Sequence, residues 1–323
     1  MRKVLLALGM GAFSIGAFAQ PDKSMANLAL SNNKRKDGHS KGAWTKGGLF
    51  SLNVAQGSSA NWVAGAEKFS LSVNGYMNLF ADKKWGKNAW DNNLDLSYGL
   101  LNTTSLGLRK NNDLIDFRSK YAYQIKKNFN FAALLSFRSQ FADGFDYSVE
   151  PKRRISGWFA PAYITVAPGF EWKPNANFSL FVSPVAARCV LFTNKPYSYQ
   201  YQGGIKPDGS VEKPLALNYG VDPAREVDFQ FGAFVTAGYN KEIFKNVSYK
   251  SRLDLYSNYL QSSPLNIDVY WTNAIVMKVN SWLNVTYNID VIYDDDIKQF
   301  GPNRDAPRTQ YRSLLGIGVA TRL

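Results

Sequence analysis

Long stretches of this sequence alternate between apolar and polar residues with a period of two. In residues 69–79, for example, Phe69, Leu71 and Val73 alternate with serine and asparagine. This alternation is typical of a β-strand that has one apolar and one polar face. The pattern recurs along most of the chain, and no segment shows the 3.6-residue spacing of an amphipathic helix. We therefore expect an all-β fold.

The alternation predicts about twelve strands, most of them long. Strands in soluble sheets cluster near 5–6 residues, whereas about 9–11 residues are needed to cross a bilayer at a tilt. This length favours a transmembrane barrel over a soluble β-sandwich or a lipocalin-like barrel, in which the apolar face would point inward. The predicted strands are 45–56, 66–80, 88–103, 112–126, 128–142, 155–172, 177–193, 226–240, 246–260, 265–279, 281–295 and 309–323.

The predicted connections differ in length in a regular way. Even-numbered connections are short, whereas odd-numbered ones are mostly long, and this is how periplasmic turns and external loops differ in outer-membrane barrels. We therefore predict a transmembrane antiparallel up-and-down β-barrel with both termini in the periplasm. The short connections lie around 82–87, 127, 173–176, 241–245 and 280, and the odd-numbered ones are 57–65, 104–111, 143–154, 194–225, 261–264 (also short) and 296–308.

Three prolines fall inside the sixth and seventh predicted strands. Pro161, Pro168 and Pro184 each lack the backbone N–H that a strand donates to its neighbour. We therefore expect bulges or bends at these positions.

The last predicted strand, 309–323, is expected to close the ring by pairing with the first strand near Leu49–Val54. Such an apolar strand also resembles the signal read by the outer-membrane insertion machinery, although that signal usually ends in Phe and this one ends in Leu. Small residues at 316, 318 and 320 would let the wall curve beside an inward Arg312. The residues expected to face lipid are Tyr311, Leu315, Ile317, Val319 and Leu323.

The first nineteen residues have the features of a secretory signal peptide. Arg2 and Lys3 precede an apolar stretch, and Ala17-Phe18-Ala19 predicts cleavage after Ala19. A buried N-terminal helix is the alternative interpretation. We expect 1–19 to be the signal peptide, 20–43 a flexible periplasmic arm and 44–323 the barrel, which places the protein in the outer membrane.

Residues 44–71, WTKGGLFSLNVAQGSSANWVAGAEKFSL, carry a pattern of tryptophan, glycine and asparagine. The pattern resembles the opening of a family of Bacteroidota outer-membrane β-barrels known only as a domain of unknown function. The similarity continues in WDNNLDLSYGLLN and LRKNNDLIDFRSKYAY, and it implies the fold and the location but no reaction. Ala66 replaces the second glycine of the family's G-G-E. The matching residues are Trp44, Gly47, Gly48, Ser51, Leu52, Asn53, Gln56, Asn61, Trp62, Gly65 and Glu67.

We expect no enzymatic activity, and an outer-membrane hydrolase is the less favoured alternative. The single histidine, His39, lies in the polar arm, and the single cysteine, Cys189, lies in an apolar run without a nearby base. The chain also lacks the G-x-S-x-G and H-E-x-x-H motifs of two hydrolase classes.

Three consecutive aspartates, Asp294–Asp296, lie at the end of the eleventh predicted strand, at the predicted external rim. An aspartic-protease pair would need two carboxylates in one pocket, and Asp294 and Asp296 point to the same face whereas Asp295 does not. Calcium needs six or more oxygen ligands, and divalent cations also bridge lipopolysaccharide to carboxylates. The favoured interpretation is a solvated start of a loop, so no metal and no cofactor are expected.

The chain has a formal net charge of +13. It lacks the basic helix and the aromatic sheet motif of nucleic-acid-binding proteins, so we expect no nucleic-acid partner. The expected partners are outer-membrane lipid and lipopolysaccharide, the insertion machinery during biogenesis, and a protein partner in a membrane complex.

Charged residues on the polar faces of the strands are expected to line the barrel lumen. They either pair across strands and fill a narrow barrel, or they line a water-filled path that selects small polar solutes. The 194–225 connection is long enough to constrict the lumen or to form a surface for partners. We expect a narrow channel, with a closed structural barrel or a subunit of an outer-membrane complex as the alternative. The candidate lumen residues are Asp116, Arg118, Lys120, Arg138, Arg252, Asp254, Asp268, Lys278, Asp290 and Arg312.

Overall fold

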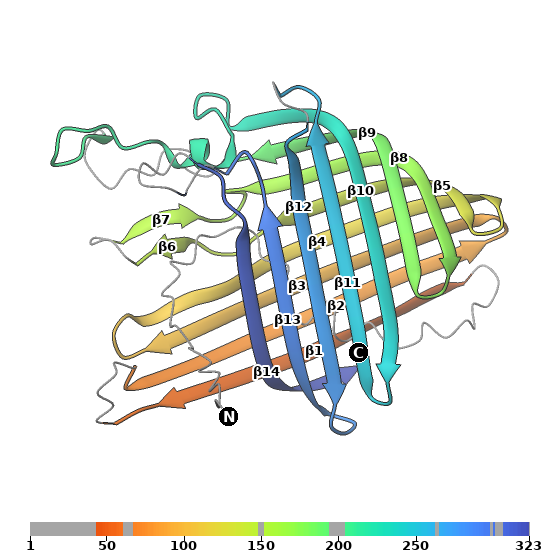
Figure 1. Cartoon of the computed structure of the whole chain (residues 1–323), viewed down its shortest axis with the longest axis horizontal. Helices are drawn as coiled ribbons and strands as arrows, with labels where there is room; N and C mark the ends of the chain where they lie inside the picture. The colour runs from red at the N-terminus through yellow and green to blue at the C-terminus, as the bar shows by residue number, and fades with distance from the viewer. Residues whose placement is uncertain are drawn as a thin grey trace, which may run out of the picture.

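The computed structural model describes residues 43–60, 67–147, 152–193, 204–261, 265–297, 300 and 306–322. In these residues twelve antiparallel strands form one closed barrel (Figure 1), which confirms the predicted fold class. The strands are β1 (Trp44–Ser58), β2 (Phe69–Trp85), β3 (Asn88–Thr103), β4 (Gly107–Lys126), β5 (Phe129–Ser139), β8 (Ala162–Asn175), β9 (Phe178–Leu191), β10 (Val227–Phe244), β11 (Val247–Asn258), β12 (Ile267–Lys278), β13 (Leu283–Tyr293) and β14 (Gln310–Arg322).

The ring closes between the first and the last strand, as predicted. β1 pairs with β14 in antiparallel register from Leu49 opposite Arg322 to Asn53 opposite Gly318. On the outside of β14, Tyr311, Leu315, Ile317 and Val319 are exposed, whereas Leu323 lies outside the described residues.

Two small elements were not predicted from the sequence. A hairpin of β6 (Gly144–Asp146) and β7 (Arg153–Ser156) lies in the connection between β5 and β8, and a 3-10 helix, η2 (Leu215–Tyr219), lies between β9 and β10. Both lie at the same end of the barrel, on the left of Figure 1. The prediction of one strand over 155–172 is therefore wrong at its start, because β8 begins at Ala162.

The turns at the opposite end are short, and we call this end the short-turn end. Gly86 and Lys87 join β2 to β3, and residues 245–246 join β10 to β11. We call the other end, where β6, β7 and η2 lie, the loop end. One connection there differs from its prediction, because the expected loop 104–111 is a turn of residues 104–106 only. Gly107 makes this turn possible, since its φ of 65° lies in the left-handed region that glycine tolerates.

Two of the three prolines lie at irregularities in the ladder, as expected. The register of β8 against β9 shifts between Val166 and Phe170, around Pro168. Pro184 lies opposite the shift between Gly232 and Phe234 in β10. The Ser183 hydroxyl donates a hydrogen bond to the Pro168 carbonyl oxygen at 2.6 Å, and this bond compensates for part of the backbone pairing that is interrupted here. Pro161 precedes β8 and is not part of a strand.

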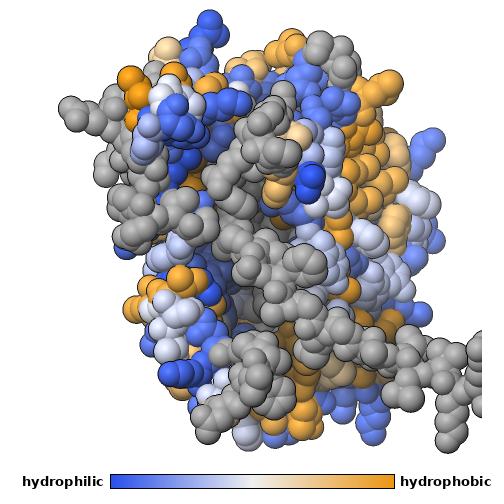
Figure 2. Space-filling view, turned by 60° about the vertical axis from the view of Figure 1, so that its left-hand side comes forward, coloured by the Kyte–Doolittle hydropathy of each residue, from blue (hydrophilic) through white to orange (hydrophobic). Residues whose placement is uncertain are grey.

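The two faces of the wall differ in chemistry. Large apolar side chains such as Phe50, Leu135, Val166 and Leu315 are exposed on the outside, whereas the inward-facing aspartates of β3, β4, β11, β12 and β13 are buried. Figure 2 shows hydrophobic residues gathered on the flank of the barrel, on the right of the view, and hydrophilic ones over the loops. None of the helices among the described residues is long and apolar enough to cross a membrane.

Polar atoms on the outer wall are bonded to one another. The Trp271 indole N–H donates to Ser251 Oγ at 3.0 Å, and the Tyr249 hydroxyl donates to Asn273 Oδ1 at 2.7 Å. Pairing of this kind removes the cost of placing these groups in an apolar medium.

We expect Gly232→Ala to destabilise the barrel. A Cβ at this position would lie 1.7 Å from the Ser257 carbonyl oxygen, so the backbone of β10 or β11 must shift. Overpacking of this kind costs about 1–3 kcal/mol. The free energy of unfolding in urea, followed by tryptophan fluorescence in detergent micelles, checks this. Gly75→Ala is the matched control, because its nearest contact would be an ordinary 3.8 Å; equal losses in both variants would contradict the account.

Candidate functional site

The lumen wall carries a network of charges on β3, β4 and β5. Arg118 contacts Asp95 at 3.0 Å and Asp116 at 3.2 Å, and Arg138 contacts Asp116 at 3.1 Å. Lys120 forms an ion pair with Glu171 of β8. Each of these side chains lies on the inward-facing parity of its strand, so one sector of the wall is a continuous array of paired charges.

Asp95 is the centre of this array, although the sequence analysis did not place it among the lumen residues. It is 2% exposed and accepts hydrogen bonds from the Tyr76 hydroxyl at 2.7 Å and from Asn78 Nδ2 at 2.5 Å. The strict alternation of β2 and β3 was the signal that could have identified these three residues, since it assigns all of them to the polar face.

The remaining candidates lie on the opposite sector. Arg252 contacts Asp254 at 2.8 Å on β11, and Arg312 of β14 contacts Asp290 of β13 at 2.6 Å. Lys278 differs from the others, because it is the last residue of β12 and is exposed at the short-turn end. The structure therefore places nine of the ten candidates on the inner wall and one at its rim.

Among the described residues, an ion pair joins two strands that are not neighbours, across part of the lumen. Arg188 of β9 contacts Asp268 of β12 at 2.7 Å, although β10 and β11 separate these strands in the ring. The Arg188 guanidinium also lies 3.5 Å from the centre of the Tyr256 ring. On the other side, Arg138 of β5 lies 5.2 Å from the ring centre of Tyr270 of β12. These contacts form a bar across the lumen near the loop end.

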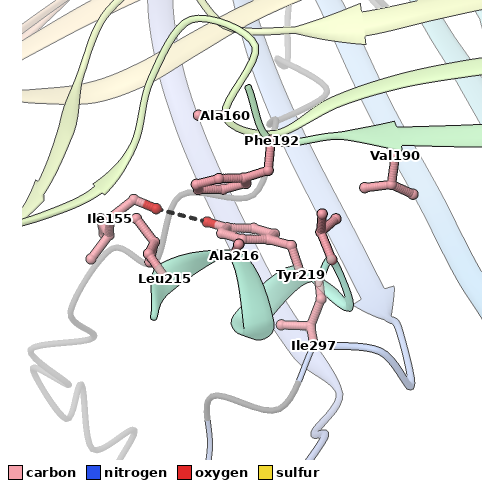
Figure 3. Close-up of a cluster of buried hydrophobic side chains, with 9 residues drawn as sticks. Ile155, Ala160, Val190, Phe192, Leu215, Ala216, Tyr219 and Ile297 are labelled. Atoms are coloured by element: carbon pink, nitrogen blue, oxygen red, sulfur yellow. Dashed lines mark hydrogen bonds between the residues drawn. The ribbon is translucent and has the colours of Figure 1, made fainter. Parts of the chain in front are cut away.

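A cluster of buried apolar side chains, which we call the cap, lies at the loop end of the barrel (Figure 3). The Tyr219 ring stacks on Phe192 at 5.4 Å, and its hydroxyl donates to the Ile155 carbonyl oxygen at 3.0 Å. Three long connections and the end of β9 thus meet in one cluster. Its members are Ile155, Ala160, Val190, Phe192, Leu215, Ala216, Tyr219, Val221 and Ile297.

Part of the 194–225 connection belongs to the cap. Leu215, Ala216, Tyr219 and Val221 pack in this cluster with Ile155, Phe192 and Ile297. Residues 194–203 lie outside the part of the chain that is described.

Hydrogen bonds of the aspartates after β13 connect this part of the cap to the barrel wall. Asp296 accepts hydrogen bonds from Gln230 Nε2 of β10 at 3.0 Å and from Gln261 Nε2 at 2.5 Å, and its backbone N–H donates to Asp294. Asp294 is only 4% exposed. The prediction of a solvated loop start is therefore wrong for Asp294. Among the described residues, no three His, Cys, Asp or Glu side chains are arranged to hold a metal ion.

Both carboxyl groups have raised pKa values. Burial raises the pKa of Asp296 to about 6, and the nearby Asp268 carboxylate adds to this shift. Burial also raises the pKa of Asp294, with Asp268 and Asp296 contributing in the same direction. The segment after β13, which contributes Ile297 to the cap, is thus sensitive to protonation near pH 6.

The motif residues of the first strand have structural contacts. The Phe80 ring lies over Gly47, where an added Cβ would come within 2.7 Å of it. Trp44 packs against Trp90 with ring centres 5.5 Å apart. The Glu67 carboxylate accepts hydrogen bonds from the backbone and hydroxyl of Ser105, so it ties the first loop to the turn after β3.

The other motif residues do not converge on one point. Asn53 Nδ2 donates to Ser51 Oγ at 3.4 Å, Gly48 pairs with Leu79, and Gln56 is exposed. Asn61, Trp62 and Gly65 lie outside the described residues, as do His39 and the signal and arm segments up to residue 42.

Comparison with known proteins gives one family match and several distant structural similarities. Residues 54–145, from the end of β1 to β6, match the family described as "Protein of unknown function (DUF3078)". No curated protein matches the sequence significantly.

Three solved structures illustrate the structural similarity. The COG4313 outer membrane channel from Pseudomonas putida F1 is 8% identical, with a TM-score of 0.38 and coverage of 88% of this chain and 96% of that chain. The translocator domain of autotransporter NalP from Neisseria meningitidis is 7% identical, with a TM-score of 0.38 and coverage of 89% and 90%. Outer membrane phospholipase A from Escherichia coli is 8% identical, with a TM-score of 0.35 and coverage of 85% and 89%. These similarities assign no activity to the chain.

We expect the loop after β13 to be more stable at pH 5 than at pH 7.5. A carboxyl whose pKa is raised to about 6 in the folded protein, above the usual value of about 4, favours folding at low pH, and this contribution is lost as the pH rises through 6. Hydrogen exchange of the Asp296 and Ile297 amides, corrected for intrinsic rates, measures the effect.

Asp296→Asn should reduce this pH dependence, because an amide stays neutral at both pH values. Asp208→Asn is the control, since Asp208 is exposed and hydrogen bonds from Ser210 lower its pKa, away from this range. Unchanged pH dependence in Asp296→Asn would contradict the assignment.

Proposed function

We propose that the chain is an integral outer-membrane β-barrel that forms a narrow channel for small polar solutes. The observation that carries the proposal is the inner wall, where arginines, lysines and carboxylates line strands β3, β4, β5, β11 and β13. A channel that selects small polar solutes is lined in this way. In this proposal, the family that residues 54–145 match is the same as the Bacteroidota outer-membrane barrel family that the opening motif resembles.

The outer wall supports the membrane location. An apolar band bounded by aromatic residues at both interfaces is typical of outer-membrane barrels. Most of the exposed aromatic residues fall toward the two ends of the strands, whereas Phe50 and Trp271 lie near the middle of β1 and β12. Those at the ends are Trp44, Trp90, Tyr121, Tyr123, Phe129, Phe131, Phe170, Trp172, Phe244 and Trp282 at the short-turn end and Phe69, Tyr98, Phe141, Trp158, Phe229, Tyr259 and Tyr311 at the loop end.

In this proposal the short turns face the periplasm, and the cap faces the outside. Lipid and lipopolysaccharide surround the wall, and the insertion machinery acts on the chain during biogenesis. The proposal assigns no enzymatic role. It gives the motif residues Gly47 and Glu67 a part in folding the wall rather than in chemistry.

A specific observation favours a second candidate, a closed barrel that serves as a structural element or as a subunit of a membrane complex. The Arg188–Asp268 pair crosses the lumen. A cluster of apolar side chains also fills part of the inner wall, formed by Ala122, Ala132, Leu134, Ala167, Phe181, Ala186, Phe234 and Tyr256. A barrel packed in this way needs no open path.

Conductance in planar lipid bilayers distinguishes the two candidates. For a channel, we expect small discrete current steps from the native protein and larger ones from the double variant Arg188→Ala/Asp268→Ala, which removes both partners of the ion pair together and so leaves neither of the two without the other. Arg225→Ala is the control, because its side chain is exposed in a loop. Folding of each variant is checked by heat-modifiable migration on a gel.

Absence of current steps from both the native protein and the double variant, with folding intact, would contradict the channel. Purification with a partner in fixed stoichiometry would then favour the complex subunit.

A further inference from the structure

The rim of the barrel at the short-turn end is strongly basic. Lysines occupy the turns and the strand ends there, and Glu242 is the exposed acidic residue among the described residues of the same rim. Anionic headgroups attract a cluster of this kind at a membrane surface. The lysines are Lys83, Lys84, Lys87, Lys126, Lys127, Lys173, Lys241, Lys245 and Lys278.

A groove lies on the outer wall next to one part of this rim. Its volume is about 430 Å³, and it is lined by Trp85, Trp90, Ser119, Tyr121, Ala133, Leu134, Leu135 and Val166. The small side chains at 119 and 133 leave space between the larger rings of β3 and β4 and the aliphatic residues of β5 and β8. The groove is therefore a depression in a wall that is otherwise covered by bulky side chains.

The polar side-chain atoms of Trp90, Ser119 and Tyr121 in the groove are already bonded within the protein. The Trp90 indole N–H donates to Ser119 Oγ at 2.8 Å, and this hydroxyl donates to Asn92 Oδ1 at 2.8 Å. The Tyr121 hydroxyl donates to Asn88 Oδ1 at 2.5 Å. The surface that remains for a ligand is thus apolar, which suits a hydrocarbon chain and not a hydroxyl-rich solute.

One end of the groove meets the basic rim. The Lys83 ammonium lies 5.5 Å from the ring centre of Trp85 and 5.8 Å from that of Trp44. Trp85 lines the groove, and Lys87 follows it in the turn between β2 and β3. The two tryptophans hold the Lys83 ammonium in place by cation–π attraction, so less entropy is lost when it binds an anion.

We propose that this groove binds one anionic phospholipid of the leaflet at the short-turn end. One acyl chain fills the groove, and the phosphate contacts Lys83 and Lys87. We choose this ligand because the groove is apolar and has positive charge at one end only. This arrangement matches an acyl chain with an anionic headgroup, whereas a neutral detergent or a peptide has no group that requires the lysines. The inference rests on the membrane location proposed above.

Native mass spectrometry after delipidation in mild detergent tests the proposal, with phosphatidylglycerol and phosphatidylcholine as the probes. We expect the native protein to retain one phosphatidylglycerol in preference to phosphatidylcholine. Ala133→Phe fills the groove and should abolish retention of both lipids. Lys83→Gln/Lys87→Gln should abolish the preference for the anionic lipid, whereas Lys241→Gln/Lys245→Gln, elsewhere on the rim, should preserve it.

Retention of phosphatidylglycerol by Ala133→Phe at the native level would overturn the proposal, as would equal effects of the two lysine pairs. Preferential retention of lipid A would also overturn it, because lipid A belongs to the other leaflet. Failure of the native protein to insert into liposomes or to show heat-modifiable migration would instead contradict the membrane barrel itself. Insertion without retained phospholipid would contradict the groove alone.

Discussion

Backbone pairing between β1 and β14 is the interaction on which the rest of this structure depends. A sheet of twelve strands has two edges, and each edge carries N–H and C=O groups that need partners. Five residue pairs, from Leu49–Arg322 to Asn53–Gly318, join these edges and close the ring. Only when the wall is closed do the polar faces of all strands share one lumen, where their charges can pair.

The pairing of charges inside the lumen follows from this closure. Along neighbouring strands, Arg118, Asp116 and Arg138 form a ladder of contacts between 3.1 and 3.2 Å. Across the lumen, Arg188 reaches Asp268 on a strand that is not its neighbour. Charged side chains on the inner wall can interact with polar solutes, but they also occupy space in the lumen. Whether they leave a continuous water-filled path distinguishes the channel from the closed barrel.

The wall was predictable from the sequence, whereas the lumen contacts and the cap were not. A period of two fixes which residues share a face, and the placement of Tyr311, Leu315 and Ile317 on the outside followed from it alone. The Arg188–Asp268 pair joins residues whose distance depends on the curvature of the closed ring, and no local pattern encodes this distance. η2 and the β6–β7 hairpin are too short to show a period, and they are held by contacts such as the stacking of Tyr219 on Phe192.

The central claim is that the outer face of the barrel wall contacts lipid and that the inner face does not. Oxygen and nickel-chelate accessibility of spin labels, placed one at a time at positions 311–319 of β14 in a Cys189→Ser background, tests it directly. The account predicts high oxygen accessibility at 311, 315, 317 and 319 and low oxygen accessibility at 312, 316 and 318. Equal accessibility of both sets to the water-soluble nickel chelate, with no period of two, would contradict it.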